Sequence, residues 1–519
     1  MTDVTPTMRL HPQPTAGTAR PWAFPAPERG GLPNGLTVLH SHRPGQQVIA
    51  VEVNVIAPLA AEPADQEGVA TIMARALSEG TDRHSAEEFA AELERYGATL
   101  DAHADHPGVR VSLEVPASRL DKALGLLADA LRAPAFAESE IERLVRNRLD
   151  EIPHELANPG RRAAMALYDA LFPAESRMSR PRQGTAESVA RIDAKAVRAF
   201  YEAHVRPAAA TAVVVGDLTG IDLDAVLADT LGAWTGPAAA EPVWAQVTAD
   251  DTGRVVIVDR PGAVQTQLLI GRVGPDRHDP VHPARRLGIY CLGGTLTSRL
   301  DRVLREEKGY TYGVRAFSQV LRSRADGAGA ALLGIRGSVA TEVTGPALED
   351  LWRVLRELSE GGLTDEERDA AVQYLVGVAP LSLRDRGCGR RDAGGPGRGG
   401  AAGRLPGDAV HAAGRDRHRR GDGGGGAGVP RGPAGDRSGR RRGEDRGAGA
   451  GPGHRRRDGG PRLTVLAFAR APPAAGPGAP AVVGRTPPAH DSAVFTAENH
   501  SVFRGAIGIP RFLPYSSGQ

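Results

Sequence analysis

A short stretch of the chain contains the side chains that most often bind metal ions. His103, Asp105 and His106 supply imidazole and carboxylate groups close together, and such groups are common zinc ligands. The three residues lie at a predicted hairpin turn, however, where solvated polar residues are usual. We therefore interpret them as turn residues. Another pair, His40 and His42, shares one face of a predicted strand and has no third partner nearby.

A glycine-rich turn, LGGT at 292 to 295, is a candidate for a nucleotide site. It lacks the Lys-Ser/Thr ending that a phosphate-binding loop requires, so a nucleotide-binding function is not favoured. The composition excludes other classes. The net charge of +2 gives no overall signal for nucleic-acid binding, and two cysteines are too few for a disulfide framework or a thiolate zinc site. No segment resembles a signal peptide or a membrane span, which predicts a cytoplasmic protein.

The chain contains an internal repeat. GLTVLHSHRPGQQVIAVEVNV (35 to 55) resembles GRVVIVDRPGAVQTQLLIGRV (253 to 273), and both read as two strands joined in a hairpin by an Arg-Pro-Gly turn. LSEGT is echoed by LGGT further along, and a helix ending at Gly97 is echoed by one ending at Gly309. Three features in the same order at nearly constant spacing predict a duplication.

Each half mixes strands with long helices. SAEE (85 to 88) and TDEE (364 to 367) are predicted capping boxes, and the first half closes with an apolar strand at 211 to 218. These patterns predict an α+β fold with two homologous domains in tandem, each with helices on a largely antiparallel sheet. The predicted segments are a disordered N-terminal segment (1–28), a first domain (29–234), a linker (235–252), a truncated second domain (253–384) and a low-complexity tail (385–519).

One predicted amphipathic helix has no residue able to do chemistry. GVATIMARALSEGT (68 to 81) ends in a glycine turn. Together with NGLTVLHSHRPG, VVVGDL, VDRPGAVQTQLLIG and LGGTLTSRLDRVLREEKGYTYGV, this stretch resembles the insulinase and mitochondrial processing peptidase family of zinc metallopeptidases. The resemblance covers about residues 30 to 380.

The resemblance implies where a zinc site would lie. In the family, HxxEH on this helix supplies two histidine ligands and a general base, and a downstream glutamate is the third ligand. The matching positions here are Thr71, Ala74 and Arg75, and the third-ligand position is Glu151. Because one carboxylate cannot build an open tetrahedral site, we expect no intrinsic catalysis and no zinc in this chain. Glu151 is then most simply a residue on a helix surface.

The resemblance also accounts for a helix that lacks the catalytic residues. Several family members work as two chains, one of which carries HxxEH while the other supplies an arginine and a tyrosine that contact substrate. The matching residues are Arg305 and Tyr312, at the end of a helix predicted over 297 to 308 and in the strand that follows. On residue type alone, Arg305 equally fits pairing with Asp301 at i, i+4, and Tyr312 fits half-buried packing. Tyr310 is predicted to face the other side of the strand.

From about Asp385 to Gly460 the chain becomes rich in glycine and arginine without hydrophobic periodicity. One interpretation is a disordered segment that binds nucleic acid by charge. The favoured one is a GC-rich gene read out of frame, because interleaved acidic residues blunt the basic charge and no regular repeat appears. The second domain is then expected to lack two or more helices and its closing strand.

The sequence therefore predicts a non-catalytic, substrate-binding subunit of a heterodimeric zinc metallopeptidase that processes peptides in a clam-shaped chamber. The partner would be a homologous subunit with HxxEH, which would hold the zinc. The alternatives are a scaffold or peptide-binding protein of the same fold, and a decayed, frameshifted allele.

Overall fold

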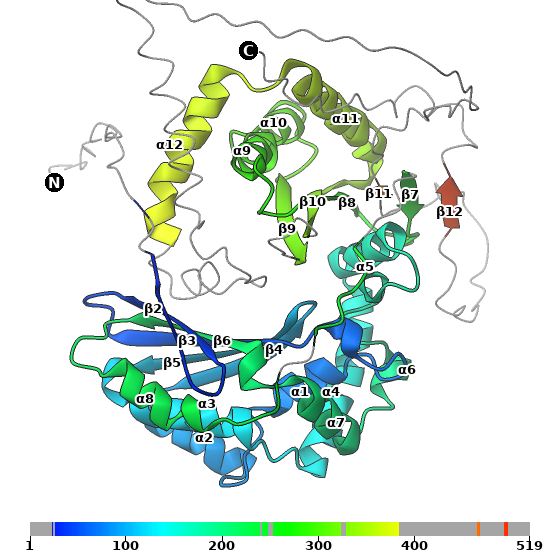
Figure 1. Ribbon diagram of the computed structural model, residues 1–519. Helices are drawn as coiled ribbons and strands as arrows, with labels where there is room; N and C mark the ends of the chain where they lie inside the picture. The colour runs from blue at the N-terminus through cyan, green and yellow to red at the C-terminus, as the bar shows by residue number, and fades with distance from the viewer. Residues whose placement is uncertain are drawn as a thin grey trace, which may run out of the picture. The chain divides into compact units, whose positions relative to one another are not determined.

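The computed structural model in Figure 1 describes residues 23, 26–238, 241–247, 253–322, 329–382, 464–467 and 493–496. The chain divides into two compact units. The first comprises the described residues of Met1–Arg146, Ser188–Val243 and Thr364–His411. The second comprises those of Asn147–Glu187, Trp244–Leu363 and Ala412–Gln519. The predicted disordered segment 1–28 falls almost entirely outside the described residues.

The first unit is built on a six-stranded sheet with the order β1-β2-β6-β3-β5-β4. Its strands are β1 (Glu28–Gly31), β2 (Thr37–His42), β3 (Val48–Ile56), β4 (Thr99–Asp105), β5 (Gly108–Pro116) and β6 (Ala210–Gly216). The β6 strand runs parallel to β2 and antiparallel to β3, and all other pairs are antiparallel. The predicted hairpin of β2 and β3 is therefore wrong. Every residue of β6 is buried, and such an apolar strand is most stable in the interior of the sheet.

Helices cover one face of this sheet. They are α1 (Val69–Ala76), α2 (Ala86–Arg95), α3 (Leu120–Arg132), α7 (Ala194–His204) and α8 (Leu223–Asp229), while the residues of α4 (Glu138–Ala157) and α6 (Ala186–Val189) are divided between the two units. Among them, α1, α2 and α3 contact the sheet directly, and α1 also packs against α7. The predicted capping box at Ser85 and Glu88 is confirmed at the start of α2, and Gly97 follows that helix with a left-handed φ of 61°.

The second unit repeats the sheet, with the order β12-β7-β11-β8-β10-β9. Its strands are β7 (Arg254–Ile257), β8 (Gln265–Gly274), β9 (Val314–Arg322), β10 (Ala330–Ala340), β11 (Thr464–Ala467) and β12 (Ala493–Thr496). The β11 strand lies parallel to β7 and antiparallel to β8, as β6 does between β2 and β3. The duplication is therefore confirmed in the pairing of the strands.

The expected loss of the closing strand is wrong, because β11 occupies that place in the sheet. Its four residues, TVLA, follow the glycine-rich stretch and carry the β-branched and apolar side chains that a central strand requires. The expected loss of the last helices falls on residues 383–463, which lie outside the described residues.

The second sheet is covered on both faces. On one face lie α9 (His282–Gly293), α10 (Arg299–Asp301) and α11 (Thr344–Gly361) over a core that includes Ile270, Leu304 and Ile335. On the other lies α5 (Pro159–Leu171), whose Leu167 belongs to a second core with Leu332. Because α5 comes from the first half of the sequence, the units differ from the predicted linear domains 29–234 and 253–384.

The remaining described elements are short or peripheral. They are the 3₁₀ turns Leu59–Ala61, Ala117–Arg119, Arg177–Ser179, Pro207–Ala209, Leu231–Ala233 and Thr341–Val343, the π-helical turns Arg302–Glu307, and α12 (Asp365–Ser382). The capping box predicted at Thr364 and Glu367 is confirmed at the start of α12. None of the helices in the described ranges is long and apolar enough to cross a membrane.

Candidate functional site

The helix that matches the family's catalytic helix is held firmly at its N-terminus. Gly68 precedes α1 with a φ of 103°, a conformation that favours glycine. The buried carboxylate of Glu62 accepts hydrogen bonds from the backbone amides of Gly68 and Ala70, each at 3.0 Å. A negative charge there also complements the helix dipole. The scaffold that positions this helix is intact.

The side chains on α1 do not form a metal site. Thr71 is 4% exposed, and its Oγ1 has no hydrogen-bond partner among the described residues. Ala74 is fully buried and its side chain has no polar atom, and Arg75 lies in the last turn of the helix. No group of three metal-ligating side chains occurs in the ranges that the structure describes. Threonine, alanine and arginine cannot replace two histidines and a base.

Glu151 is already used in an ion-pair network on α4. Its carboxylate lies 3.1 Å from the guanidinium of Arg148, which is only 1% exposed. Arg148 also donates to Glu155 at 2.7 Å and to the carbonyl of Gln183 at 3.2 Å. A buried guanidinium needs such partners, so Glu151 has a structural role. The residues present do not fit the zinc ion that the family's catalytic site holds.

Arg305 is at the surface of the second unit. It belongs to the π-helical turns, its side chain is 36% exposed, and its Nε lies 3.5 Å from Glu306. The alternative pairing with Asp301 is wrong. Asp301 is fully buried and accepts hydrogen bonds from the amide of Val314 at 3.0 Å and from Arg315 at 2.6 Å.

Tyr312 is 92% exposed, whereas Tyr310 packs partly buried against the core beneath α9 to α11. The alternative of half-buried packing is therefore wrong for Tyr312. Tyr312 does not lie in a strand, because β9 begins at Val314. Instead it follows Thr311, whose hydroxyl donates to the carbonyl of Ser338 at 2.6 Å. This bond holds the segment beside β10 and leaves the ring of Tyr312 in solvent.

The local helix geometry also differs from the prediction. A regular helix over 297 to 308 would align Leu296, Leu300 and Leu304, but Leu296 is largely exposed. Only Arg299–Asp301 is α-helical, and π-helical turns follow as far as Glu307. Gly309, with a φ of 65°, ends the segment as predicted. Asp301, which fixes the start of β9, was missed as a positioning residue because its spacing suggested a surface pair.

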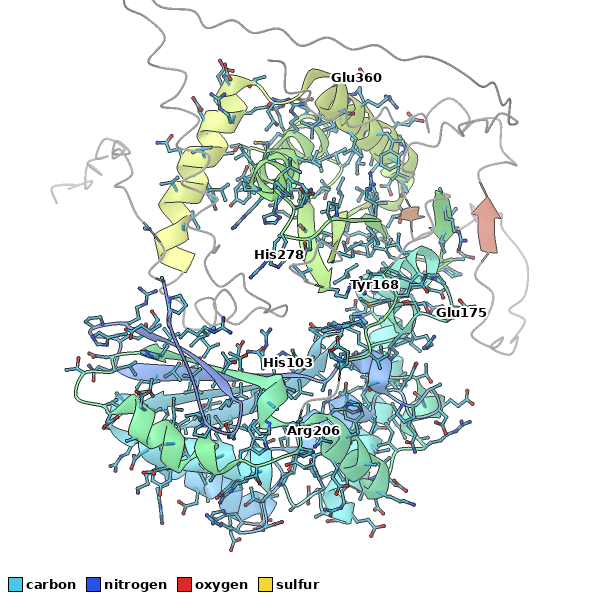
Figure 2. The ribbon with its side chains drawn as sticks, viewed as in Figure 1. His103, Tyr168, Glu175, Arg206, His278 and Glu360 are labelled. Atoms are coloured by element: carbon cyan, nitrogen blue, oxygen red, sulfur yellow. The ribbon has the colours of Figure 1, made fainter. Side chains whose placement is uncertain are left out.

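The other candidate clusters have structural partners. His103 lies on β4, as Figure 2 shows, with its Nδ1 3.8 Å from Asp101. Asp105 accepts a hydrogen bond from the amide of His106 in the turn. His42 accepts a hydrogen bond from the amide of Leu218 at 3.0 Å. The interpretation of the cluster as solvated turn residues is wrong for two of the three, because His103 lies within the strand β4 and His106 is buried at 8% exposure.

The comparisons with known proteins agree with this arrangement. Residues 37–181 match the family model of insulinase (peptidase family M16), and residues 191–375 match that of the peptidase M16 inactive domain. The chain belongs to the insulinase family. Its two M16 domains follow each other along the chain, and the part that matches the first model lacks the HxxEH motif.

Several curated proteins and solved structures are similar to this M16 chain. A protein named as a zinc protease of Streptomyces coelicolor is 24% identical over 367 residues, which cover 69% of this chain and 78% of the relative. The non-peptidase homolog YmxG of Helicobacter pylori is 23% identical over 317 residues, or 61% and 71% of the two chains. The structure of a peptidase M16 inactive domain from Pseudomonas fluorescens has a TM-score of 0.64 at 20% identity, over 86% of this chain and 99% of that one.

Taken with the site, these matches describe a non-catalytic member of the M16 family. The relatives include proteins named as proteases and one named as a non-peptidase. This chain differs from a catalytic member of the family at α1, where no residue of the HxxEH motif remains.

Proposed function

We propose that the chain is the non-catalytic, substrate-binding subunit of a heterodimeric M16 metallopeptidase. A homologous partner with an intact HxxEH helix would supply the zinc ion and the general base, and peptides would be cleaved in a chamber formed with this partner. The observation that carries the proposal is the exposed Tyr312 close in sequence to a partly exposed Arg305, in a chain whose α1 lacks the catalytic residues.

The exposure of the two side chains supports this role. An arginine guanidinium can donate to the carbonyl oxygens of a bound peptide. A tyrosine hydroxyl can donate to the scissile carbonyl oxygen as negative charge develops there. Asp301 helps to position Tyr312, because its carboxylate accepts a hydrogen bond from the first amide of β9, which follows the segment that carries Tyr312.

The test is peptidase activity after co-expression of this chain with the nearest HxxEH homologue of the same genome, together and separately. We expect activity only in the mixture, and its loss on chelation of zinc. Arg305→Ala should lower kcat/KM about tenfold or more, since charge-assisted hydrogen bonds contribute roughly 1.5–3 kcal/mol. Tyr312→Phe should lower kcat by up to about 100-fold.

Matched controls separate contact with substrate from a general loss of structure. Tyr310→Phe removes a hydroxyl from the neighbouring, packed tyrosine, and Arg302→Ala removes another exposed arginine of the same π-helical turns. Both should leave kcat/KM near that of the unmodified pair. No co-purification and no gain in activity would contradict the proposal and leave the scaffold as the better description.

We also propose that the stretch from about residue 385 to Gly460 is the product of a frameshift, and that the original frame returns before Thr464. The support comes from β11, because a segment with strand-forming residues completes the second sheet at the place that β6 takes in the first. The proposed second domain would then extend beyond 384 to include this strand.

A further inference from the structure

Two arginines lie opposite each other in the ladder between the edge strand β9 and its neighbour β10. In the ladder between β9 and β10, Arg315 lies opposite Arg336, and Phe317 lies opposite Gly334. Residues directly opposite in a ladder share a face, as do residues two apart along a strand. These four therefore share the face that α5 partly covers, opposite to the face of Ala316 and Ile335 beneath α9 to α11. Figure 1 shows β9 and β10 side by side.

The aromatic ring on this face lies over a glycine. A Cβ atom on Gly334 would be 2.5 Å from Cζ of Phe317, so only glycine leaves room for the ring in this position. The guanidinium carbon of Arg336 lies 5.6 Å from the centre of the same ring. A cation at this distance is attracted to the aromatic face. Phe317 therefore gives the flexible Arg336 side chain a preferred position.

The two arginines differ in their ion pairs. The guanidinium of Arg315 is paired with the buried carboxylate of Asp301 at 2.6 Å. Arg336 is exposed, and no carboxylate lies within ion-pair distance of it in the described ranges. Like charges directly opposite each other destabilise a sheet. The stability of the ladder therefore does not account for Arg336, whose guanidinium fork is left available for an anion.

The ladder relates the position of Arg336 to the segment that carries Tyr312. Val314 is paired with Gly337, the residue after Arg336, and Thr311 is bonded to Ser338, the next one. The segment that carries Tyr312 therefore runs beside the residues that follow Arg336. Arg336 is paired with Arg315, so its place in the ladder is three residues along the chain from Tyr312.

We propose that Arg336, positioned by Phe317, binds a carboxylate side chain of the substrate, so that the chain prefers acidic peptides. The inference rests on the proposed function, because it names the class of peptide bound next to Tyr312. The guanidinium offers two parallel N–H donors that match a carboxylate in a bidentate arrangement. An amide side chain of the same shape lacks both the charge and the second acceptor oxygen.

The test is a binding measurement on the full chain without a catalytic partner. Fluorescence anisotropy would compare an unstructured peptide that contains several glutamates with its counterpart in which each glutamate is glutamine. We expect the glutamate peptide to bind about tenfold more tightly, with a preference that weakens as salt is added. Arg336→Gln should remove the preference, and Phe317→Leu should reduce it.

The control is Arg286→Gln on α9, an exposed arginine on the helix that covers the opposite face. It changes the net charge by the same amount and should retain the preference. Equal binding of both peptides to the unmodified chain would overturn the inference, as would a preference that survives in Arg336→Gln. Because the assay needs no peptidase activity, a failed co-expression experiment would reject the proposed function and leave this result interpretable.

Discussion

Asp301 illustrates how a single residue decides which side chains remain available. A sequence spacing of four suggests a surface pair with Arg305, but this holds only where the helix has 3.6 residues per turn. Here π-helical turns begin at Arg302 and change the directions of the side chains that follow. Asp301 instead points inward to Val314 and Arg315. The roles proposed for Arg305 and Tyr312 thus depend on a local geometry that residue types do not encode.

Asp217 provides a prediction for pH dependence. Hydrogen bonds from the Thr219 hydroxyl and then from the amides of Gly45 and Thr219 lower the pKa of Asp217 from 3.8 to about 2. A carboxyl group whose pKa is lower in the folded state stabilises the protein above its unfolded pKa and loses this effect as the pH falls. Asp217→Asn should therefore remove part of the loss of stability between about pH 4 and pH 2.

Thermal unfolding of both proteins across this range, followed by circular dichroism, would measure the effect. Asp365→Asn is a suitable control, since Asp365 is an exposed carboxylate in the first turn of α12. If Asp217→Asn and the unmodified chain lose stability in parallel from pH 4 to pH 2, the hydrogen bonds at Asp217 do not contribute.

At the level of elements, local signals in the sequence were reliable and pairing was not. Ser85 and Glu88 predict a helix start because both partners of the capping box lie within one turn. The Arg-Pro-Gly turn after β2 predicts a hairpin with equal clarity, yet β6 enters between β2 and β3. The residues of this turn carry no signal for a strand from far along the chain that pairs between the two strands the turn connects.

The N-terminus of α1 gives a prediction at this scale. Glu62→Ala removes the buried carboxylate that accepts from the amides of Gly68 and Ala70, and leaves both donors unsatisfied. We expect the free energy of unfolding to fall by about 1–3 kcal/mol. Urea denaturation would measure it. Glu87→Ala, in the exposed first turn of α2, is the control, and an equal effect of both substitutions would argue against a special role for Glu62.

At the scale of the molecule, α5 links the two halves of the sequence. Leu167 comes from the first half but packs on the second sheet, where its methyl groups lie about 3.1–3.4 Å from the position of a Cβ on Gly271. Leu167→Ala should destabilise by about 2–5 kcal/mol through the cavity that it leaves. The exchange of amide hydrogens in β8 and β10 should accelerate, while β3 and β5 keep their protection.

Asp169→Ala, an exposed change on the same helix, should leave the exchange in all four strands unchanged. Faster exchange in β3 and β5 upon Leu167→Ala, with β8 and β10 unaffected, would show that α5 stabilises the first sheet instead. The result would also tell whether a fragment that begins at residue 253 can fold, because such a fragment lacks α5.

The proposed frameshift makes a prediction for the gene. Sequencing of the DNA across codons 380 to 465 should reveal two compensating insertions or deletions, one near codon 385 and another before codon 464. Peptide mass spectrometry of the purified protein should then find the sequence of the alternative frame between these points. An unbroken frame together with peptides that match the present sequence would reject the proposal.

The central strands β6 and β11 also set the order in which the protein can be completed. Each is made after the two strands between which it lies, so a ribosome releases β2 and β3 long before the strand that joins them. Until then both have unpaired edges, which are prone to aggregation. The stretch of chain made between a strand pair and its central strand is longest for β7 and β8. We therefore expect nascent chains to depend most on chaperones between the synthesis of Gly274 and that of Thr464.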